Sequence, residues 1–265
     1  MARFDHAFAP NQSPRDALVL GNILTKSCFD VCSRLSVKRR DRQTAHISKT
    51  RALIAEYIED AENDAVILDN GRSGDLVAMV RIHTGRTAVP NPERPVQLLS
   101  YVIIPLDYCR LFDLIDSVCE MALSLRTVSG VVTVEESFGR AQSFALSTLS
   151  DRSNDLVDGI VTEERLKERA AHYFFSEQLP IKIAAPEWGL FLSTEHLKVL
   201  PLSQLEKASI FSAVRALSSE LAFIQMTENP RDALAPQFNL ELSKAREALH
   251  PILMDASHLP DAAWK

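Results

Sequence analysis

The sequence predicts an α+β protein with a mixed, largely antiparallel sheet flanked by helices. Segments of helical periodicity and segments rich in β-branched residues follow one another without strict alternation, which disfavours a doubly wound α/β sheet. The turn sequence Asn70–Gly74 joins two β-rich segments as a hairpin. The first 60 or so residues look purely helical. We therefore expect a helical N-terminal segment (residues 1–60) packed on a main domain (residues 61–265), with one continuous globular unit preferred over two lobes.

Two helices are predicted in the N-terminal segment. The first begins at Ser13, where a capping residue precedes a first-turn proline, and its apolar residues recur at helical spacing as far as Leu35. A short basic run, Lys38–Arg42, separates it from a second helix over about Ser48–Asp60. The polar side and the exit of this second helix carry five carboxylates: Glu56, Glu59, Asp60, Glu62 and Asp64.

Strands dominate the next part of the chain. We expect them at Ala65–Asp69, Leu76–His83 and Val96–Ile104, which are enriched in β-branched and aliphatic residues. The three prolines before the third segment remove backbone donors, so that stretch is a loop. A helix over Tyr108–Arg126 follows, with Asp107 as its cap and one apolar stripe as its buried face.

A strand at Val131–Val134 and a helix over about Phe138–Leu149 come next, and the polar stretch Asp151–Asp158 is expected to be a loop. This loop is also the place where the chain would divide if it had two lobes. A further helix begins at Thr162 and runs to about Ser176.

The last part of the chain alternates between helix and strand. Ser203 and Glu206 match a capping box, so a helix is expected to begin there and to run to about Leu217. Leu221–Met226 is predicted to be a strand, and a final helix covers about Asn239–Met254 with a kink at Pro251.

Composition excludes several classes of protein. The 265 residues are 46% hydrophobic and 24% charged, which is typical of a globular chain. A net charge of −6 argues against direct binding of nucleic acid, because such binding depends on basic residues that neutralise phosphates. No apolar stretch approaches the ~20 residues that a membrane span requires, and the N-terminus lacks the apolar core of a signal peptide. We therefore expect a cytoplasmic protein, monomeric or homodimeric, that does not enter a membrane.

No catalytic, cofactor or metal signature is present in the sequence. The eight glycines form no Gly-x-Gly, so the loops that cradle phosphates and dinucleotides are missing. No two histidines have zinc-ligand spacing, and no Glu-x-Lys pair of the kind found in nucleases occurs. We therefore predict no catalytic, cofactor-binding or metal-binding residues and expect that the protein is not an enzyme, although a site assembled from distant residues stays an open alternative.

The pattern with the strongest link to function is acidic. Asp113, Asp116 and Glu120 fall at i, i+3 and i+7 of the predicted helix over Tyr108–Arg126, opposite its apolar stripe. Glu135 and Glu136 form another acidic group, in addition to the five carboxylates near residue 60. Each group alone is explained by a solvated helix or loop face. Together they predict a negative surface that accelerates encounter with a basic partner.

Two stretches of the sequence carry a resemblance to a known family. The C-terminal stretch runs from Pro186-Glu187-Trp188-Gly189-Leu190-Phe191-Leu192-Ser193 through Leu221–Met226 and Thr227-Glu228-Asn229-Pro230-Arg231-Asp232-Ala233-Leu234 to Ala245–Met254. It resembles the immunity proteins encoded beside toxins of bacterial type VI secretion systems. The order of elements in Val96–Glu136 is similar to immunity proteins paired with restriction-endonuclease-like toxins. The resemblance covers roughly residues 65–254.

The resemblance implies a non-enzymatic role. The protein would bind a cognate effector toxin, a nuclease with a basic groove, and block its active site or its access to substrate. A secretion-system adaptor or chaperone that binds without inhibiting is one alternative, and a small ligand-binding protein or hydrolase with a non-local site is another. Trp188 is expected to anchor the core, with an interface hot spot as the alternative.

Overall fold

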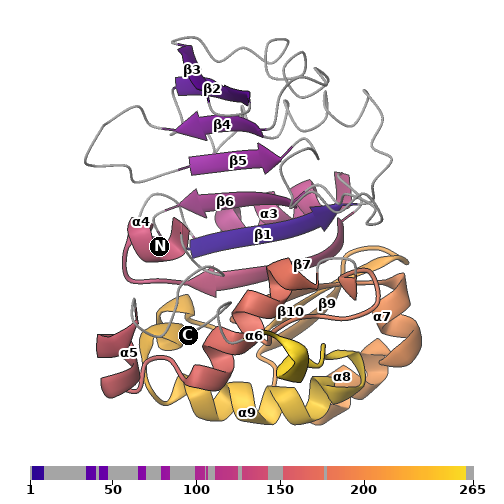
Figure 1. The fold of residues 1–265 in the computed structure, drawn as a ribbon. Helices are drawn as coiled ribbons and strands as arrows, with labels where there is room; N and C mark the ends of the chain where they lie inside the picture. The colour runs from indigo at the N-terminus through magenta and orange to yellow at the C-terminus, as the bar shows by residue number, and fades with distance from the viewer. Residues whose placement is uncertain are drawn as a thin grey trace. The chain divides into compact units, whose positions relative to one another are not determined.

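The computed structural model describes residues 2–8, 34–39, 42–46, 65–69, 79–83, 99–104, 106, 111–124, 127–142, 152–175 and 178–260. The chain divides into two compact units, Met1–Thr127 and Val128–Lys265 (Figure 1). Each unit contains antiparallel strands together with at least one helix, so the predicted α+β class is confirmed.

The first unit contains a six-stranded antiparallel sheet with the order β3-β2-β4-β5-β6-β1. Its one described helix is α3, Leu111–Ser124. Of the basic run Lys38–Arg42, Lys38 and Arg39 end β2 and Arg42 begins β3, and Arg39 pairs with Arg42. The strands of this sheet are β1 (Ala2–Phe8), β2 (Arg34–Arg39), β3 (Arg42–His46), β4 (Ala65–Asp69), β5 (Met79–His83) and β6 (Leu99–Ile104).

The prediction of a purely helical N-terminal segment is wrong for the residues that the structure describes. β1, β2 and β3 all come from the first 60 residues, and β2 pairs with β4, so a boundary near residue 60 would cut through this sheet. The sequence of β1 alternates between apolar and polar residues from Ala2 to Asp5, but burial does not follow this alternation, because Arg3 is buried together with Ala2 and Phe4. The predicted helix over Ser48–Asp60 lies outside the described residues.

The helix predicted from Ser13 to Leu35 lies outside the described residues except at its end, where Leu35 belongs to β2. The predicted strands from Ala65 to Ile104 and the helix over Tyr108–Arg126 agree with the structure in type and place. β4 has its predicted bounds, while β5 and β6 are shorter than predicted. The helix α3 lies inside the predicted helix, and Ile115, Val118 and Ala122 from its apolar stripe are buried. The cap Asp107 and the turn Asn70–Gly74 lie outside the described residues.

The second unit contains a four-stranded antiparallel sheet with the order β7-β8-β10-β9, and Figure 1 shows the helices of this unit around it. Its strands are β7 (Thr127–Val134), β8 (Gly189–Ser193), β9 (Ala213–Ala216) and β10 (Leu221–Gln225). Its helices are α4 (Phe138–Gln142), α5 (Ser153–Val157), α6 (Glu163–Phe174), α7 (Thr194–Val199), α8 (Leu202–Ala208) and α9 (Phe238–Leu249), with 3-10 turns η3 (Pro230–Leu234), η4 (His250–Ile252) and η5 (Ala256–His258).

The helix α6 is confirmed, including its N-terminus. The backbone N–H of Arg165 donates to the Thr162 hydroxyl at 3.1 Å and so satisfies one of the free donors of the first turn. The prediction of a loop over Asp151–Asp158 is wrong for most of the stretch, because Ser153–Val157 forms the short helix α5.

Two further predictions for the second unit need correction at their ends. The helix predicted from Ser203 begins at Leu202, after Pro201, and stops at Ala208, where Ser209 adopts φ +54°. β9 follows where that helix was expected to continue. The final helix ends at Leu249, and the chain turns into η4, which contains Pro251.

The core of the second unit is built around β8 and β10. The rings of Phe191 and Phe223 lie 4.9 Å apart between centroids on these paired strands. Trp188 is buried, and its indole N–H donates to the Thr227 carbonyl at 3.1 Å, so its interpretation as a core anchor is confirmed. Within the described part of the chain, no helix is both long and apolar enough to cross a membrane.

Candidate functional site

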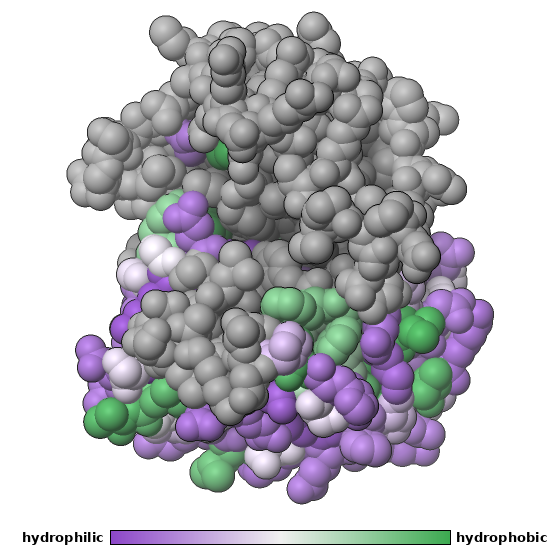
Figure 2. Space-filling model, in the orientation of Figure 1, coloured by the Kyte–Doolittle hydropathy of each residue, from purple (hydrophilic) through white to green (hydrophobic). Residues whose placement is uncertain are grey.

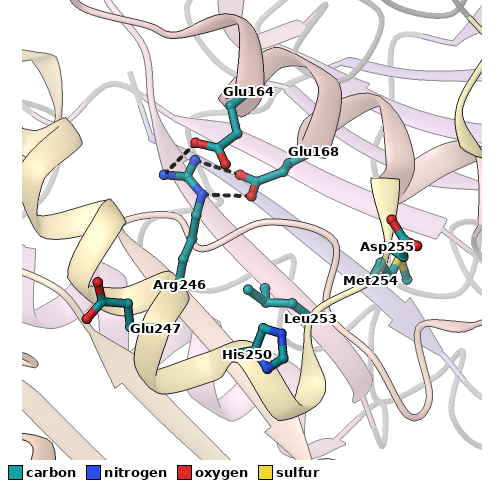
Figure 3. Close-up of a pocket in the computed structure, with 8 residues that line it drawn as sticks. All are labelled: Glu164, Glu168, Arg246, Glu247, His250, Leu253, Met254 and Asp255. Carbon is teal, nitrogen blue, oxygen red and sulfur yellow. Dashed lines mark hydrogen bonds and ion pairs between the residues drawn. The ribbon is translucent and has the colours of Figure 1, made fainter. Parts of the chain in front are cut away.

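An open pocket of about 530 Å³ lies beside the N-terminal half of α6 in the second unit (Figure 3). α6 contributes Glu164 and Glu168, one helical turn apart. α9 buries its apolar stripe and thereby turns Arg246 and Glu247 towards the other side of the pocket. The lining is completed by the chain that leaves α9: His250, Leu253, Met254 and Asp255.

Backbone contacts fix the segment that leaves α9. The Ile183 N–H donates to the Ile252 carbonyl and the Met254 N–H donates to the Ile183 carbonyl, both at 2.8 Å. These bonds form a parallel bridge between Ile183 and Leu253. The Lys182 ammonium donates to the Pro251 carbonyl, also at 2.8 Å. One wall of the pocket is therefore tied by backbone hydrogen bonds to the segment that precedes β8 and does not depend on side chains alone.

Arg246 links the two helices that border the pocket. Its Nε and Nη2 each lie 2.7 Å from one oxygen of Glu168, and its Nη1 lies 3.4 Å from Glu164. Burial raises the pKa of Glu168 above its ordinary value, while Arg246 pulls it down. Burial lowers the pKa of Arg246, but the hydrogen bond and charge of Glu168 outweigh it and raise that pKa. The Arg246 guanidinium thus stays charged, and its N–H groups are engaged by the carboxylates of Glu168 and Glu164.

The rim of the pocket carries further negative charge. Glu247 and Asp255 are exposed, and His250 beside them is exposed as well. The Ser257 N–H donates to Asp255 at 2.8 Å, and this hydrogen bonding lowers the pKa of Asp255. The lining holds four carboxylates and one guanidinium, so the pocket is electronegative at neutral pH.

A chain of ion pairs, buried except at its Arg140–Glu136 end, runs behind α6 and ties five segments of the second unit together. Arg169 lies at its centre, with its Nε 2.6 Å from Glu187 and its Nη1 2.8 Å from Glu135. Arg165 donates to both oxygens of Glu187, at 2.7 and 3.3 Å. The chain is continued by Arg152 bound to Glu135 at 3.0 Å, by Asp155 bound to Arg152 and Arg140, and by Glu136 at 3.4 Å from Arg140.

The charges of this network are matched in number, and its two most buried carboxylates, Glu135 and Glu187, remain ionised. Burial alone would raise the pKa of Glu187, but Arg165 and Arg169 outweigh it and lower the pKa to about 2. The pKa of Glu135 is likewise lowered, since Arg169 and Arg152 outweigh its burial. Carboxylates whose pKa is held below its ordinary value stay deprotonated near neutral pH and are poor acids or bases there. The network therefore fixes the geometry behind the pocket and is unsuited to acid–base chemistry.

Of the acidic residues predicted to form a negative surface, the structure shows some as exposed, while others lie outside its described part. Asp116 and Glu120 are exposed on α3, as predicted. Asp113 lies on the same helix, but its side chain is outside the described part, as are Glu56, Glu59, Asp60, Glu62 and Asp64.

Glu135 requires a correction and Glu136 does not. Glu135 is only 2% exposed and contributes nothing to an acidic surface, because arginines from later in the chain enclose it. Glu136 is exposed, at 49% for its side chain, and lies beside Arg140.

Sequence analysis missed the pocket residues. Glu164 and Glu168 are spaced i, i+4, as are Arg246 and His250, so each pair could be assigned to one helix face. The approach of the two faces to each other is tertiary and has no local signal. Within the described residues, no group of three or more His, Cys, Asp or Glu side chains is arranged to hold a metal ion.

The surface of the second unit is mainly polar on the face drawn in Figure 2, where hydrophilic side chains surround separate hydrophobic patches. The most exposed large apolar side chains among the described residues are Val157, at 86%, and Leu240, at 65%. A protein partner that docks on this face would therefore meet polar and charged groups over most of the contact.

Comparison with known proteins gives a relationship at the level of fold. No protein-family model matches the chain, and no curated protein matches its sequence. Among solved structures, the chain is similar to the Pseudomonas aeruginosa T6SS protein PA0821, with a TM-score of 0.60 and 13% sequence identity. The alignment covers 95% of this chain and 76% of that protein. The comparison therefore shows a likeness of fold to this T6SS protein.

Proposed function

We propose that the chain is an immunity protein that binds a cognate type VI secretion effector and neutralises it without catalysing a reaction. The observation that carries this proposal is the likeness in fold to a T6SS protein over 95% of the chain. The resemblance of residues 65–254 to immunity proteins supports inhibition of the effector as the activity.

Electrostatics favours a nuclease as the effector. Nucleases carry basic grooves for nucleic acid, and a protein with a net charge of −6 is attracted to such a groove. Asp116 and Glu120 place negative charge on the exposed side of α3 in the first unit, and the pocket does so in the second. Binding would block the active site or the access of the nucleic acid to it.

The test begins with affinity purification of the chain from its native host and identification of the retained proteins by mass spectrometry. We expect a stoichiometric toxin partner whose activity falls on addition of the purified chain, and whose expression is tolerated only when the chain is co-expressed. A partner that is retained but stays fully toxic would replace immunity by the role of an adaptor or chaperone. A bait that returns alone at concentrations where a tight complex persists would remove the proposal.

A further inference from the structure

We propose that the pocket lined by Glu164, Glu168, Arg246, Glu247, Leu253 and Asp255 receives a lysine or arginine side chain presented by a protein partner. This inference deepens the proposed function by naming a contact of the partner, and it rests on that function only for the partner being a protein. Three observations support it: the charge of the lining, the occupation of Arg246, and the apolar wall.

The charge of the lining selects a cation. Glu164, Glu168, Glu247 and Asp255 set four negative charges against the one positive charge of Arg246, which leaves −3 with His250 neutral. The pocket is open, with the side chains of Glu164 and Asp255 66% and 69% exposed, so water screens each charge in part and the attraction comes from several carboxylates acting together. A cationic group inside it is attracted by carboxylates on two sides.

The ion pairs of Arg246 with Glu168 and Glu164 disfavour an anionic ligand in the pocket. Its Nε and Nη2 are bound to both oxygens of Glu168, and its Nη1 is directed to Glu164, as the dashed lines in Figure 3 show. An incoming phosphate or carboxylate would have to displace these charge-assisted bonds and approach the remaining acidic groups. Glu247, by contrast, makes no hydrogen bond or ion pair within the described part of the chain, so its carboxylate is available to a ligand.

The apolar wall distinguishes a basic side chain from a bare metal ion. Leu253 and Met254 line the pocket; in Figure 3, Leu253 lies near His250 and Met254 lies beside Asp255. Lysine and arginine carry aliphatic stems that cover apolar surface while the charged head reaches polar groups. A metal ion would instead require oxygens that converge on one point, and the described residues contain no such group.

The test uses blocked amino acids that imitate a residue within a protein chain. We would titrate the full chain with N-acetyl-arginine methylamide and N-acetyl-lysine methylamide and follow backbone amides by ¹H–¹⁵N NMR. We expect saturable shifts confined to residues 247–255 and the first two turns of α6. N-acetyl-citrulline methylamide, a neutral isostere of the arginine probe, is expected to bind about tenfold more weakly because it lacks the charge.

Two variants locate the interaction. Glu247→Lys places a positive charge on the rim and is expected to weaken the basic probes about tenfold or more. Glu228→Lys makes the same change of charge at an exposed position outside the pocket and is expected to leave binding unchanged. Both residues are exposed, and the NMR spectrum of each variant reports directly whether its fold is retained.

The outcomes separate this inference from the proposed function. Absence of saturable shifts, equal binding of the citrulline probe, or no effect of Glu247→Lys would overturn it, even if a toxin is retained by the bait. Binding of the basic probes to the pocket would support it, even if no toxin is found. Tighter binding of free arginine or lysine than of the blocked forms would overturn it in favour of a free amino acid as ligand.

Discussion

Arg169 joins two buried carboxylates that come from different parts of the chain, Glu187 at 2.6 Å and Glu135 at 2.8 Å. All three side chains are almost fully buried. Removal of the guanidinium would leave two carboxylates in a site from which water is excluded, with Arg165 and Arg152 as their remaining partners. The second unit therefore depends on this one side chain more than on any exposed ion pair.

We predict that Arg169→Met lowers the free energy of unfolding by about 3–5 kcal/mol, because it leaves buried charge uncompensated. Urea denaturation of the full chain measures this change. Lys198→Met is the matched control: it breaks the exposed pair with Glu195, at 2.6 Å, and is expected to cost less than about 1 kcal/mol. Equal effects of the two variants would show that the buried pairs are not worth more than exposed ones.

Gly189→Ala is expected to destabilise the sheet of the second unit. An added Cβ would lie 2.9 Å from Cε2 of Phe223 and 3.0 Å from Cβ of Val132, which is closer than van der Waals contact allows. Overpacking of this kind costs about 1–3 kcal/mol, measurable as a lower urea midpoint. Gly139→Ala serves as the control, since its Cβ meets nothing within 4 Å and alanine favours the helix α4. A midpoint that Gly189→Ala leaves unchanged would contradict the packing seen between β7, β8 and β10.

His196 makes stability depend on pH. Burial lowers the pKa of this residue to about 4, below the 6.5 of an unperturbed histidine. The unfolded state therefore takes up the proton first as the pH falls below about 6.5, and stability decreases until the folded state is protonated near 4. The loss amounts to roughly 3 kcal/mol at the acidic end.

The variant His196→Gln should lack this part of the pH dependence. Its free energy of unfolding is compared with that of the original chain in urea titrations from pH 7 down to about pH 4. The other titrating groups are common to both proteins, so the difference between the two curves isolates His196. Parallel curves would mean that the ring is protonated equally in the folded and unfolded states.

The acidic face of α3 is tested by charge reversal. We predict that the triple variant Asp113→Lys, Asp116→Lys and Glu120→Lys keeps the fold and slows association with the partner about tenfold or more, because the steering charge is inverted. A control triple variant, Glu195→Lys, Glu206→Lys and Glu228→Lys, changes the net charge by the same amount at exposed positions in the second unit. Surface plasmon resonance at low salt gives both rates. Equal rates for the two triples would remove α3 from the interface.

The fold could be predicted from sequence where the periodicity was long and unambiguous. The helix α6 and the strand β10 have strong local patterns, and both were found with nearly correct ends. The sequence of β1 is a weak strand signal, because its apolar–polar alternation extends only from Ala2 to Asp5 and is broken by His6 and Ala7. The five-residue helix α5 has no apolar stripe, and its Arg152 and Asp155 are held by ion pairs, so a polar loop was the natural prediction.

The candidate site could be predicted only in part, because tertiary structure determines which of its charged residues are buried and which are exposed. Glu135 and Glu136 are neighbours in sequence, yet one is enclosed by arginines and the other faces solvent. Nothing local distinguishes them. Likewise, the pocket joins Glu168 of α6 to Arg246 of α9, and this pairing follows from how the helices pack.

The hydrogen bonding where β8 meets α7 fixes the tautomer of His196 and limits its ability to accept a proton. Ser193 is the last residue of the strand and also the N-cap of the helix, and its backbone N–H donates to Nδ1 of His196 at 3.1 Å. A ring nitrogen that accepts a hydrogen bond carries no proton, so the neutral imidazole must be the Nε2–H tautomer. The lone pair that a general base would use is already engaged with the backbone. This histidine is therefore an architectural residue that joins strand to helix, and its ¹⁵N chemical shifts should report a single tautomer.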